Sequence, residues 1–344
     1  MAKEKGKGTK GASKKGKKPM NWAKIVIPVV LILVLIGMVF ASVLNNKVTT
    51  TPSTTTNTNK NFNNIQDALG LLPSNASYVR YLDMKNDTAM SNWAQTNYWN
   101  TMPPTSIFSA TPQRDALAVY PAGYFENSMT STSADLVSLS DFGNNKINES
   151  YSTLGYTNSG IKILKANSQY YFAPDITPVV SGGEQEVLDT LAVFDGNSGS
   201  ASGTYSDLFQ ELNMRHIAIN GMTLETAGDN STLPVWFPIS NINLTADRYY
   251  AGVGPTNVTV TMNNTTYPVY SYVAIMHLNQ TPSDNDMQYL DLLQSSNEKM
   301  GFSDYNVQVY DDYIIIDAHA PLAMCLDDMT TWDFLRYLPG SGQK

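Results

Sequence analysis

The three histidines are the side chains best suited to metal binding or acid–base chemistry, and their neighbours decide what they can do. His216 and His277 lie in β-rich runs, where we expect partly buried rings that the fold itself hydrogen-bonds. Asp317 and His319 are two residues apart, so a strand would place both on one face, where they could ligate a metal ion. Because two ligands alone make a poor site, we expect neither a bound metal nor a cofactor.

Short motifs of known catalytic sites are missing from the sequence. It contains no His-Glu-x-x-His, no Gly-x-Ser-x-Gly, no P-loop and no complete dinucleotide fingerprint. The doublets Asp311-Asp312 and Asp327-Asp328 could pair as acid and base, but an acidic chain produces such doublets through its composition alone. We therefore expect no catalytic residues and no enzyme.

Two patterns that resemble ligand sites are better explained as helix caps. Asp284-Asn285-Asp286 starts like a calcium loop but lacks that loop's central glycine and distal glutamate. Gly182-Gly183 precedes a helix that could hold an anion, yet Glu184 and Glu186 in the first turn would repel phosphate. Adjacent aromatic residues could stack on sugars, but we expect them to pack a core. These pairs are Tyr170-Tyr171, Trp236-Phe237 and Tyr249-Tyr250.

The apolar, uncharged run from Ile25 to Leu44 determines where all of these residues lie. Its 20 residues would span about 30 Å as a helix, the thickness of a bilayer's hydrocarbon core. Residues 1–24 form a basic tail with nine lysines and one acidic residue, which the positive-inside rule places in the cytoplasm. A cleaved secretory signal is the alternative, but its apolar region is usually only about 7 to 15 residues long. We predict a single-pass membrane helix at residues 25–44, with the lipid bilayer as partner.

Beyond this helix the composition is that of an exported protein. Residues 45–64 are rich in Thr and Asn and hold few apolar side chains, so we predict an extended stalk. Residues 61–344 contain 11 basic and 29 acidic residues, a net charge of about −18. Such a surface repels nucleic acid, so we expect no nucleic-acid partner.

Nine asparagines begin an Asn-x-Ser/Thr sequon, the acceptor of N-linked glycan on exposed loops of exported proteins. We expect some of them to be used, because adjacent sequons compete and a following proline weakens a site. They are Asn75, Asn86, Asn148, Asn230, Asn243, Asn257, Asn263, Asn264 and Asn279. The adjacent pair predicts an exposed hairpin turn over Asn263–Thr266, between a strand ending at Val260 and a strand beginning at Tyr267.

Cys325 is the only cysteine, so the chain forms no intramolecular disulfide. It falls on an apolar stripe with helical spacing, formed by Leu322, Cys325, Met329, Trp332 and Leu335. We predict a closing helix over Pro321–Leu338 and a buried thiol. An intermolecular bridge or a reactive thiol is the alternative.

The ordered elements predict an α+β fold made of two duplicated β-α-β-β-α units with mainly antiparallel sheets, unit 1 at 65–205 and unit 2 at 206–344. Predicted strands of unit 1 are Tyr78–Met84, Asp115–Tyr120, Ala134–Leu139, Ile161–Ala166 and Gln169–Ala173. Its predicted helices follow Asp87, span Asn145–Leu154 before a C-terminal Gly155, and span Glu184–Phe194. The counterparts in unit 2 are His216–Met222, Arg248–Val253, Tyr272–Leu278, a helix from Ser283 to Met300, Asn306–Tyr310, Tyr313–Asp317 and the closing helix.

Two segments carry a resemblance to a known family. Leu71-Leu72-Pro73-Ser74-Asn75-Ala76-Ser77-Tyr78-Val79, with Leu82-Asp83 after it, resembles the opening of an uncharacterised family of exported, membrane-anchored bacterial and archaeal proteins, a domain of unknown function. Val179-Val180-Ser181-Gly182-Gly183-Glu184-Gln185-Glu186-Val187, with Leu208-Phe209 further on, is similar to a later segment of that family. The resemblance covers residues 65–215 and implies an extracytoplasmic α+β domain without assigned activity.

Three classes of function remain open. The first is a membrane-tethered extracytoplasmic glycoprotein that binds an envelope protein or contributes structure. The second is a solute- or polysaccharide-binding accessory protein, which should show a deep, aromatic-lined pocket between the units. The third is a tethered hydrolase, which needs clustered acids with shifted pKa values in a cleft. We favour the first class, which predicts shallow clefts and an apolar patch or open β-edge.

Overall fold

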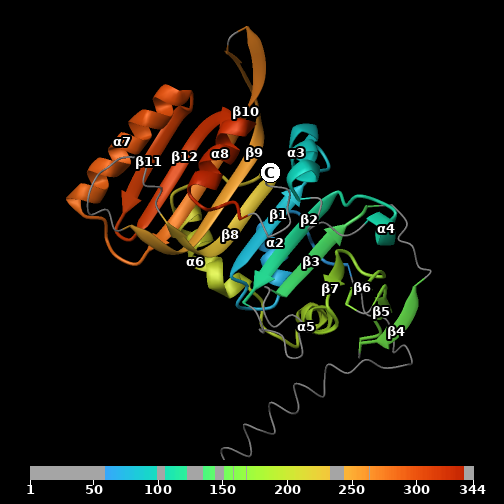
Figure 1. Ribbon diagram of the computed structural model, residues 1–344. Coiled ribbons are helices and arrows are strands. Elements are labelled where there is room, and N and C mark those ends of the chain that lie inside the picture. Colours follow the sequence, from blue (N-terminus) through green and yellow to red (C-terminus); the bar gives the residue numbers. More distant parts are fainter. Residues whose placement is uncertain are drawn as a thin grey trace, which may run out of the picture. The chain divides into compact units, whose positions relative to one another are not determined.

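A continuous antiparallel sheet forms the centre of the protein (Figure 1). The computed structural model describes residues 59–98, 105–121, 135–143, 151–157, 159–167, 169–232, 244–262 and 264–336. The 12 strands of the sheet follow the order β11-β12-β10-β9-β8-β1-β2-β3-β7-β6-β5-β4. The predicted α+β fold with antiparallel strands is confirmed, and a single sheet continues through both predicted units.

The strands and helices have the following bounds. The strands are β1 Tyr78–Asp83, β2 Arg114–Tyr120, β3 Asp135–Asp141, β4 Ser152–Tyr156, β5 Lys162–Lys165, β6 Tyr171–Ala173, β7 Val179–Gly182, β8 Leu224–Thr232, β9 Thr245–Met262, β10 Thr265–Leu278, β11 Ser303–Tyr310 and β12 Tyr313–Pro321. The helices are α2 Ile65–Leu71, α3 Thr88–Tyr98, α4 Thr105–Phe108, α5 Glu184–Phe194, α6 Ser202–Met214, α7 Asp284–Met300 and α8 Leu322–Thr331.

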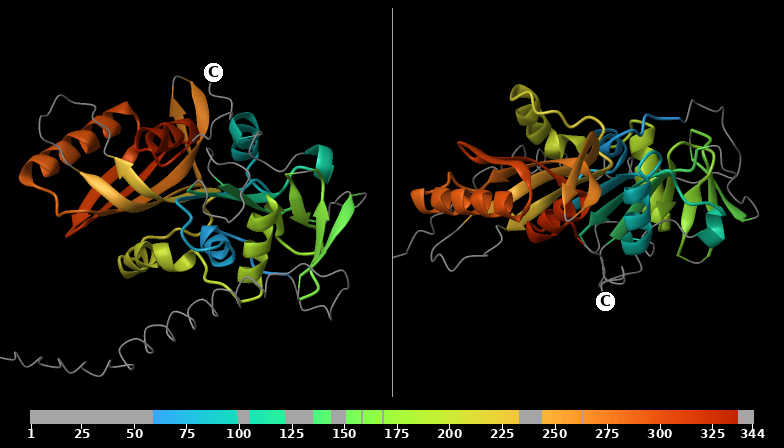
Figure 2. Two further views of the ribbon diagram at one scale, coloured as in Figure 1. Left: turned by 60° about the horizontal axis from the view of Figure 1, so that its bottom comes forward. Right: turned by 90° about the horizontal axis from the view of Figure 1, so that it is seen from above.

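Helices cover both faces of the sheet, as the turned views show (Figure 2). Buried side chains of α3, α7 and α8 join a core cluster on one face, and those of α2, α5 and α6 join a cluster on the other. Strand β1 supplies both clusters, since Tyr78 and Leu82 lie in the first while Val79 and Tyr81 lie in the second. This alternation follows from the two-residue period of a strand, and it makes β1 a buried, central strand.

Two helices, α3 and α7, begin at the polar caps that the sequence predicts, and α7 ends at a glycine. The Met90 N–H donates to Asp87 Oδ1 over 2.9 Å at the start of α3. Ser283 and Asp286 form a capping box at the start of α7, and Gly301 ends this helix with a φ of 118°. A cap of this kind contributes about 1 kcal/mol to stability. The interpretation of the Asp284–Asp286 run as a helix cap is confirmed.

Two predicted elements of the chain's middle are wrong. Residues 152–154 of the predicted helix Asn145–Leu154 lie in β4, as does Gly155, and the rest of that helix falls outside the described residues. His216–Met222 is a turn segment rather than a strand, because α6 occupies Ser202–Met214 and His216 has a left-handed φ of 59°. The strand of the second predicted unit that corresponds to β1 is instead β8, which begins at Leu224 and pairs with β1.

The closing helix is shorter than the predicted Pro321–Leu338. Helix α8 ends at Thr331, where Asp333 adopts a φ of 58° and the Phe334 N–H donates to the Met329 carbonyl over 2.8 Å. Trp332 is nevertheless fully buried, because the chain turns back onto the same core. The apolar stripe that predicted the helix therefore extends beyond the end of α8, into residues that are buried but not helical.

Two predictions about the organisation of the chain, the membrane span and the division into two units, stay predictions. Among the residues that the structure describes, no helix is long and apolar enough to cross a bilayer, and the predicted span at 25–44 falls outside those residues. The predicted boundary between 205 and 206 falls inside α6, whose buried Tyr205 and Leu208 pack in the core.

Candidate functional site

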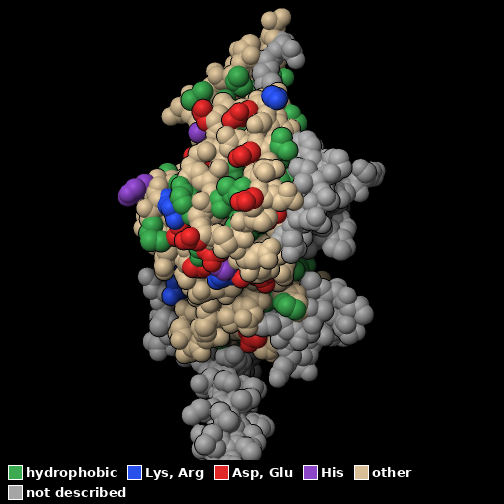
Figure 3. Space-filling view, turned by 90° about the vertical axis from the view of Figure 1, so that its left-hand side faces the viewer, with side chains coloured by type: hydrophobic (Ala, Val, Ile, Leu, Met, Phe, Trp, Pro, Cys, Tyr) green, Lys and Arg blue, Asp and Glu red, His purple; other side chains and the backbone are tan. Residues whose placement is uncertain are grey.

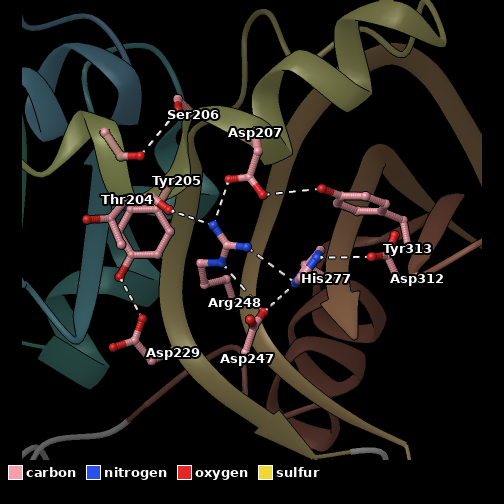
Figure 4. A network of polar contacts seen from close by, with 11 residues as sticks. Thr204, Tyr205, Ser206, Asp207, Asp229, Asp247, Arg248, His277, Asp312 and Tyr313 are labelled. Carbon is pink, nitrogen blue, oxygen red and sulfur yellow. Dashed lines mark hydrogen bonds and ion pairs between the residues drawn. The ribbon is translucent and has the colours of Figure 1, made fainter. Parts of the chain in front are cut away.

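His277 stands at the centre of a polar network on the α6 side of the sheet (Figure 4). Arg248, His277 and Tyr313 are direct neighbours across β9, β10 and β12, so one face presents all three. His277 Nδ1 lies 2.7 Å from Asp247 Oδ1, and its Nε2 lies 3.3 Å from Asp312 Oδ2. The predicted imidazole within a strand, bonded by the fold itself, is confirmed for His277.

The same network holds helix α6 against the sheet (Figure 4). Arg248 Nη1 donates to Asp207 Oδ1 over 3.0 Å, and the Tyr313 hydroxyl donates to Asp207 Oδ2 over 3.2 Å. Burial, followed by the charge of Asp207, raises the pKa of Tyr313 to about 12, so this phenol stays protonated and remains a donor. The charged side chains are 20 to 45% exposed, and such ion pairs contribute only about 0–1 kcal/mol each. The arrangement is that of a structural fastening between α6 and three strands.

The other histidines lie away from this network. His216 is exposed in the turn after α6, so the prediction of a partly buried strand histidine is wrong there. Asp317 and His319 both lie on β12. Burial raises the pKa of Asp317 above its usual value, and the nearby His319 offsets only part of this rise. Within the described residues, no third His, Cys, Asp or Glu joins them to complete a metal site.

Two buried carboxyl groups have strongly shifted pKa values. Burial raises the pKa of Glu225 to about 8, although the Ile65 N–H and the Tyr250 hydroxyl both donate to it. Burial likewise raises the pKa of Asp328 to about 7, where Tyr305 and Asn297 donate to its carboxylate. The hydrogen bonds of Glu225 join β8 to α2 and β9, and those of Asp328 join α8 to α7 and β11.

Several predicted residues pack the core as the sequence indicates. Tyr171, Tyr249 and Tyr250 are buried, which confirms the core interpretation of these aromatic residues, whereas Trp236-Phe237 falls outside the described residues. Cys325 is a free, fully buried thiol, and burial together with Asp328 raises its pKa to about 12. The predicted buried cysteine is confirmed.

The described sequons all lie on the surface. The exposed asparagines are Asn75, Asn86, Asn230, Asn257, Asn264 and Asn279. The sites at Asn148, Asn243 and Asn263 fall outside the described residues. Whether any site carries glycan stays a prediction, but exposure satisfies the first physical requirement.

An open groove of about 530 Å³ runs beside the C-terminal end of α6. Its apolar part includes Phe209, Ile217 and Ile219, while the amides of Gln66 and Asn213 line its rim. The amide-bearing residues are exposed, and the Phe209 ring packs edge-on against Tyr250 at 5.1 Å between centroids. The groove is an open surface feature, lined also by His216, that the sequence did not indicate.

The β9–β10 hairpin extends beyond the sheet as a two-stranded arm, which we define as residues 256–268 (Figure 1). Strand β8 pairs with β9 only as far as Val253, and β12 pairs with β10 only from Val269. Among the described strands, neither side of the arm therefore has a neighbour. The predicted hairpin is confirmed by the pairing of Met262 with Thr265, but Thr265 and Thr266 of the predicted turn already belong to β10, and Asn263 falls outside the described residues.

The arm has no charged side chain, although the body that carries it is strongly acidic. No Asp, Glu, Lys or Arg occurs in the 35 residues from 249 to 283. In contrast, acidic side chains are spread over the face shown in Figure 3. Val258 is 59% exposed and Tyr267 is 41% exposed, so the arm presents apolar side chains to solvent. The sequence predicted the turn but gave no sign that the strands leave the sheet.

Comparison of the chain with protein-family models, curated proteins and solved structures yields no match. The geometry of the described residues is therefore the basis for inferring function.

Proposed function

We propose that the chain is a membrane-tethered extracytoplasmic glycoprotein that binds a protein partner at the cell envelope. The observation that carries this proposal is the arm, whose strands expose unpaired backbone groups and apolar side chains without any charge. Proteins normally protect such edges because unpaired N–H and C=O groups recruit other strands. An edge left open on a projecting hairpin suits partner binding by strand addition.

The membrane anchor, the topology and the stalk belong to the same proposal. Their support is the apolar run at 25–44, the lysine-rich tail before it and the Thr/Asn-rich residues 45–64. The exposure of the six described sequons also supports an exported glycoprotein. A basic tail inside the cell leaves the sheet and its arm outside, where an envelope partner is available.

We also propose that the sheet arose by duplication of one unit. The support for this proposal is the order of the strands, which corresponds between the two halves. Outward from the central pair, one half runs β1-β2-β3-β7-β6 and the other runs β8-β9-β10-β12-β11. The helices do not follow this symmetry, since α5 after β7 and α8 after β12 pack on opposite faces. The duplication therefore concerns the strands and excludes a strict repeat of the helices.

Crosslinking in intact cells, followed by mass spectrometry, tests the proposed function. We expect the unmodified chain to be recovered with protein neighbours, and Val260→Lys in the arm to lose them. Ser295→Lys adds the same charge on the exposed face of α7 and is the matched control that should keep the neighbours. Recovery of identical neighbours with Val260→Lys would contradict a role for the arm. Protection of the C-terminal part from external protease would contradict the topology.

A solute- or polysaccharide-binding role is the second candidate, because the groove beside α6 has a volume within the range of ligand pockets. Its lining consists mainly of amide and apolar side chains together with His216, and would suit a neutral, hydroxyl-rich ligand. The Gln66→Ala/Asn213→Ala double variant should weaken binding of neutral oligosaccharides at least tenfold in calorimetry with the full chain. Equal binding by this variant and the unmodified chain would exclude the groove.

A further inference from the structure

We propose that residues 256–262 of β9 pair with the same residues of a second copy of the chain, in an antiparallel ladder centred on Thr259. This inference rests on the proposed function, because it names the partner that the arm binds. It concerns the β9 side of the arm, where Val253 is the last residue that pairs with β8.

The adjoining part of β9 is covered, which sets where the free edge begins. A Cβ added at Gly254 would lie 2.6 Å from the Gly221 carbonyl oxygen, so the chain near Gly221 lies against that residue. From Thr256 onward no described strand lies beside β9 on the side that faces away from β10. Thr256 Oγ1 donates to the Val269 carbonyl over 2.7 Å and accepts the Val258 N–H over 3.1 Å, which fixes the base of the arm.

The hydrogen-bond pattern of the hairpin selects the register of the proposed ladder. Met262 and Thr265, two residues apart in their loop connection, are the last pair of the hairpin; such a closing pair exchanges hydrogen bonds, and hydrogen-bonded pairs alternate along the strands. Val260 is therefore bonded to Tyr267, whereas Thr259 and Thr261 direct their backbone N–H and C=O groups away from β10. A ladder centred on Thr259 uses these outward groups.

This register is self-complementary. Antiparallel pairing about Thr259 places Val258 of one copy opposite Val260 of the other, whereas Asn257, opposite Thr261, lies in the bulge at the base of the arm. Pairs of β-branched side chains are favourable across strands. A two-fold contact of this kind uses one patch on both subunits and closes as a dimer.

The opposite side of the arm does not offer the same contact. Its free part of β10 is only residues 265–268, and it ends at Pro268, which has no N–H to donate. Pro268 lies opposite Thr259, at a position whose backbone groups face away from β9. The missing donor therefore weakens the outer edge of β10, so β9 is the edge that pairs.

Charge favours a contact between arms over a contact between bodies. Residues 61–344 carry a net charge of about −18, so two bodies repel each other over most of their surfaces. The arm is uncharged and projects from the sheet, so two arms can meet while the acidic bodies remain apart (Figure 1). Anchoring in one membrane would raise the effective concentration of arms and allow a short ladder to suffice.

Site-specific thiol crosslinking of the full chain in its membrane tests this inference. Buried Cys325 leaves the unmodified chain without an accessible thiol among the described residues. Thr259→Cys places a new thiol on the two-fold axis, within reach of a bis-maleimide that spans about three residues of strand, roughly 10 Å. We expect Thr259→Cys to yield a crosslinked dimer, and Thr265→Cys at the far end of the arm to yield at least tenfold less.

A charge in the ladder sharpens the test. Val260→Lys added to Thr259→Cys should reduce the dimer at least tenfold, whereas Ser295→Lys added to Thr259→Cys should leave its yield unchanged. Crosslinking of Thr259→Cys to a different polypeptide would overturn the second copy as partner while keeping the proposed partner-binding function. Absence of any crosslinked product, with thermal unfolding unchanged, would overturn both proposals.

Discussion

The two edges formed by β11 and by the arm differ in how they are protected. Strand β11 pairs with β12 on one side, and its register shifts between Ser303 and Asn306. Asp304 adopts a left-handed φ of 56°, and Gln294 of α7 accepts the Val307 N–H over 3.1 Å. A bulge, a charge and a covering helix all discourage pairing with another chain.

The arm has only one of these devices on its β9 side, a bulge at its base, where the register shifts between the pairs Thr259–Pro268 and Pro255–Tyr270. Residues 256–262 contain no charge, no proline and no covering helix in the described structure. The same chain thus protects one end of its sheet and leaves a projecting hairpin open. An edge that is open to pairing is therefore a local property of the arm and not a general feature of the sheet.

The largest expected difference between the two edges is in the loss of stability when a tyrosine on each edge is replaced by alanine. Tyr305 on β11 is fully buried and donates to Asp328, whereas Tyr267 on the arm is 41% exposed. We expect Tyr305→Ala to lower the free energy of unfolding by about 3–5 kcal/mol, because it opens a core cavity and removes a buried donor. Tyr267→Ala should change it by less than about 0.5 kcal/mol. Equal losses in chemical denaturation would show that the arm is part of the folded core.

The body and the arm should also respond differently to pH. Burial raises the pKa of Glu225 from 4.5 in its unburied state to about 8, so folding favours the protonated carboxyl. Stability is therefore greatest below pH 4.5 for this group and falls as the pH rises toward 8. Thermal melts should show Glu225→Gln flattening this fall.

Association through the uncharged arm should stay constant over the same pH range, which crosslinking of Thr259→Cys by a pH-insensitive photoreagent can measure. A dimer yield that follows the melting temperature would show that the two regions are coupled. An unaltered pH slope in Glu225→Gln would assign the pH dependence to other groups, of which Asp328 is the first candidate.

Loss of the protecting side chain at β11 should have a smaller effect. Gln294→Ala removes the acceptor of the Val307 N–H, which costs about 1 kcal/mol. Hydrogen exchange at Val307 should become roughly fivefold faster, as that energy implies. Gln288→Ala on the exposed face of α7 is the matched control and should leave this amide unchanged. Unchanged exchange in both variants would mean that α7 does not protect the edge through Gln294.

The smallest effect is expected where α6 is fastened to the sheet. Asp207→Asn removes the ion pair with Arg248, which is partly exposed and so contributes about 0–1 kcal/mol. The melting temperature should fall slightly in low salt and hardly at all in high salt. A loss of several kcal/mol would instead give the His277 network a role in holding the fold together.

Local patterns predicted much of the fold, and the failures share a cause. Alternation and capping identified β1, β2, β3, α3, α5 and α7, since these signals depend on residues close in sequence. The helix predicted at 145–154 is contradicted at 152–154, where those residues pair as β4 with the distant residues of β5. Helix α6, Ser202–Met214, was not predicted, because the boundary between the two predicted units was placed at 205/206, inside this helix.

The features of the candidate sites also fall into two groups, those that the sequence determines and those that only the fold brings together. The sequence alone determined the single cysteine, the net charge, the uncharged stretch from 249 to 283 and the apolar run at 25–44, because these are properties of composition. Only the tertiary structure decided that Asp207, Arg248 and His277 meet, because their elements pack together through contacts distant in sequence. The tertiary structure also decided that β9 and β10 extend beyond the strands beside them, because the length of a free edge depends on where the adjacent strands end.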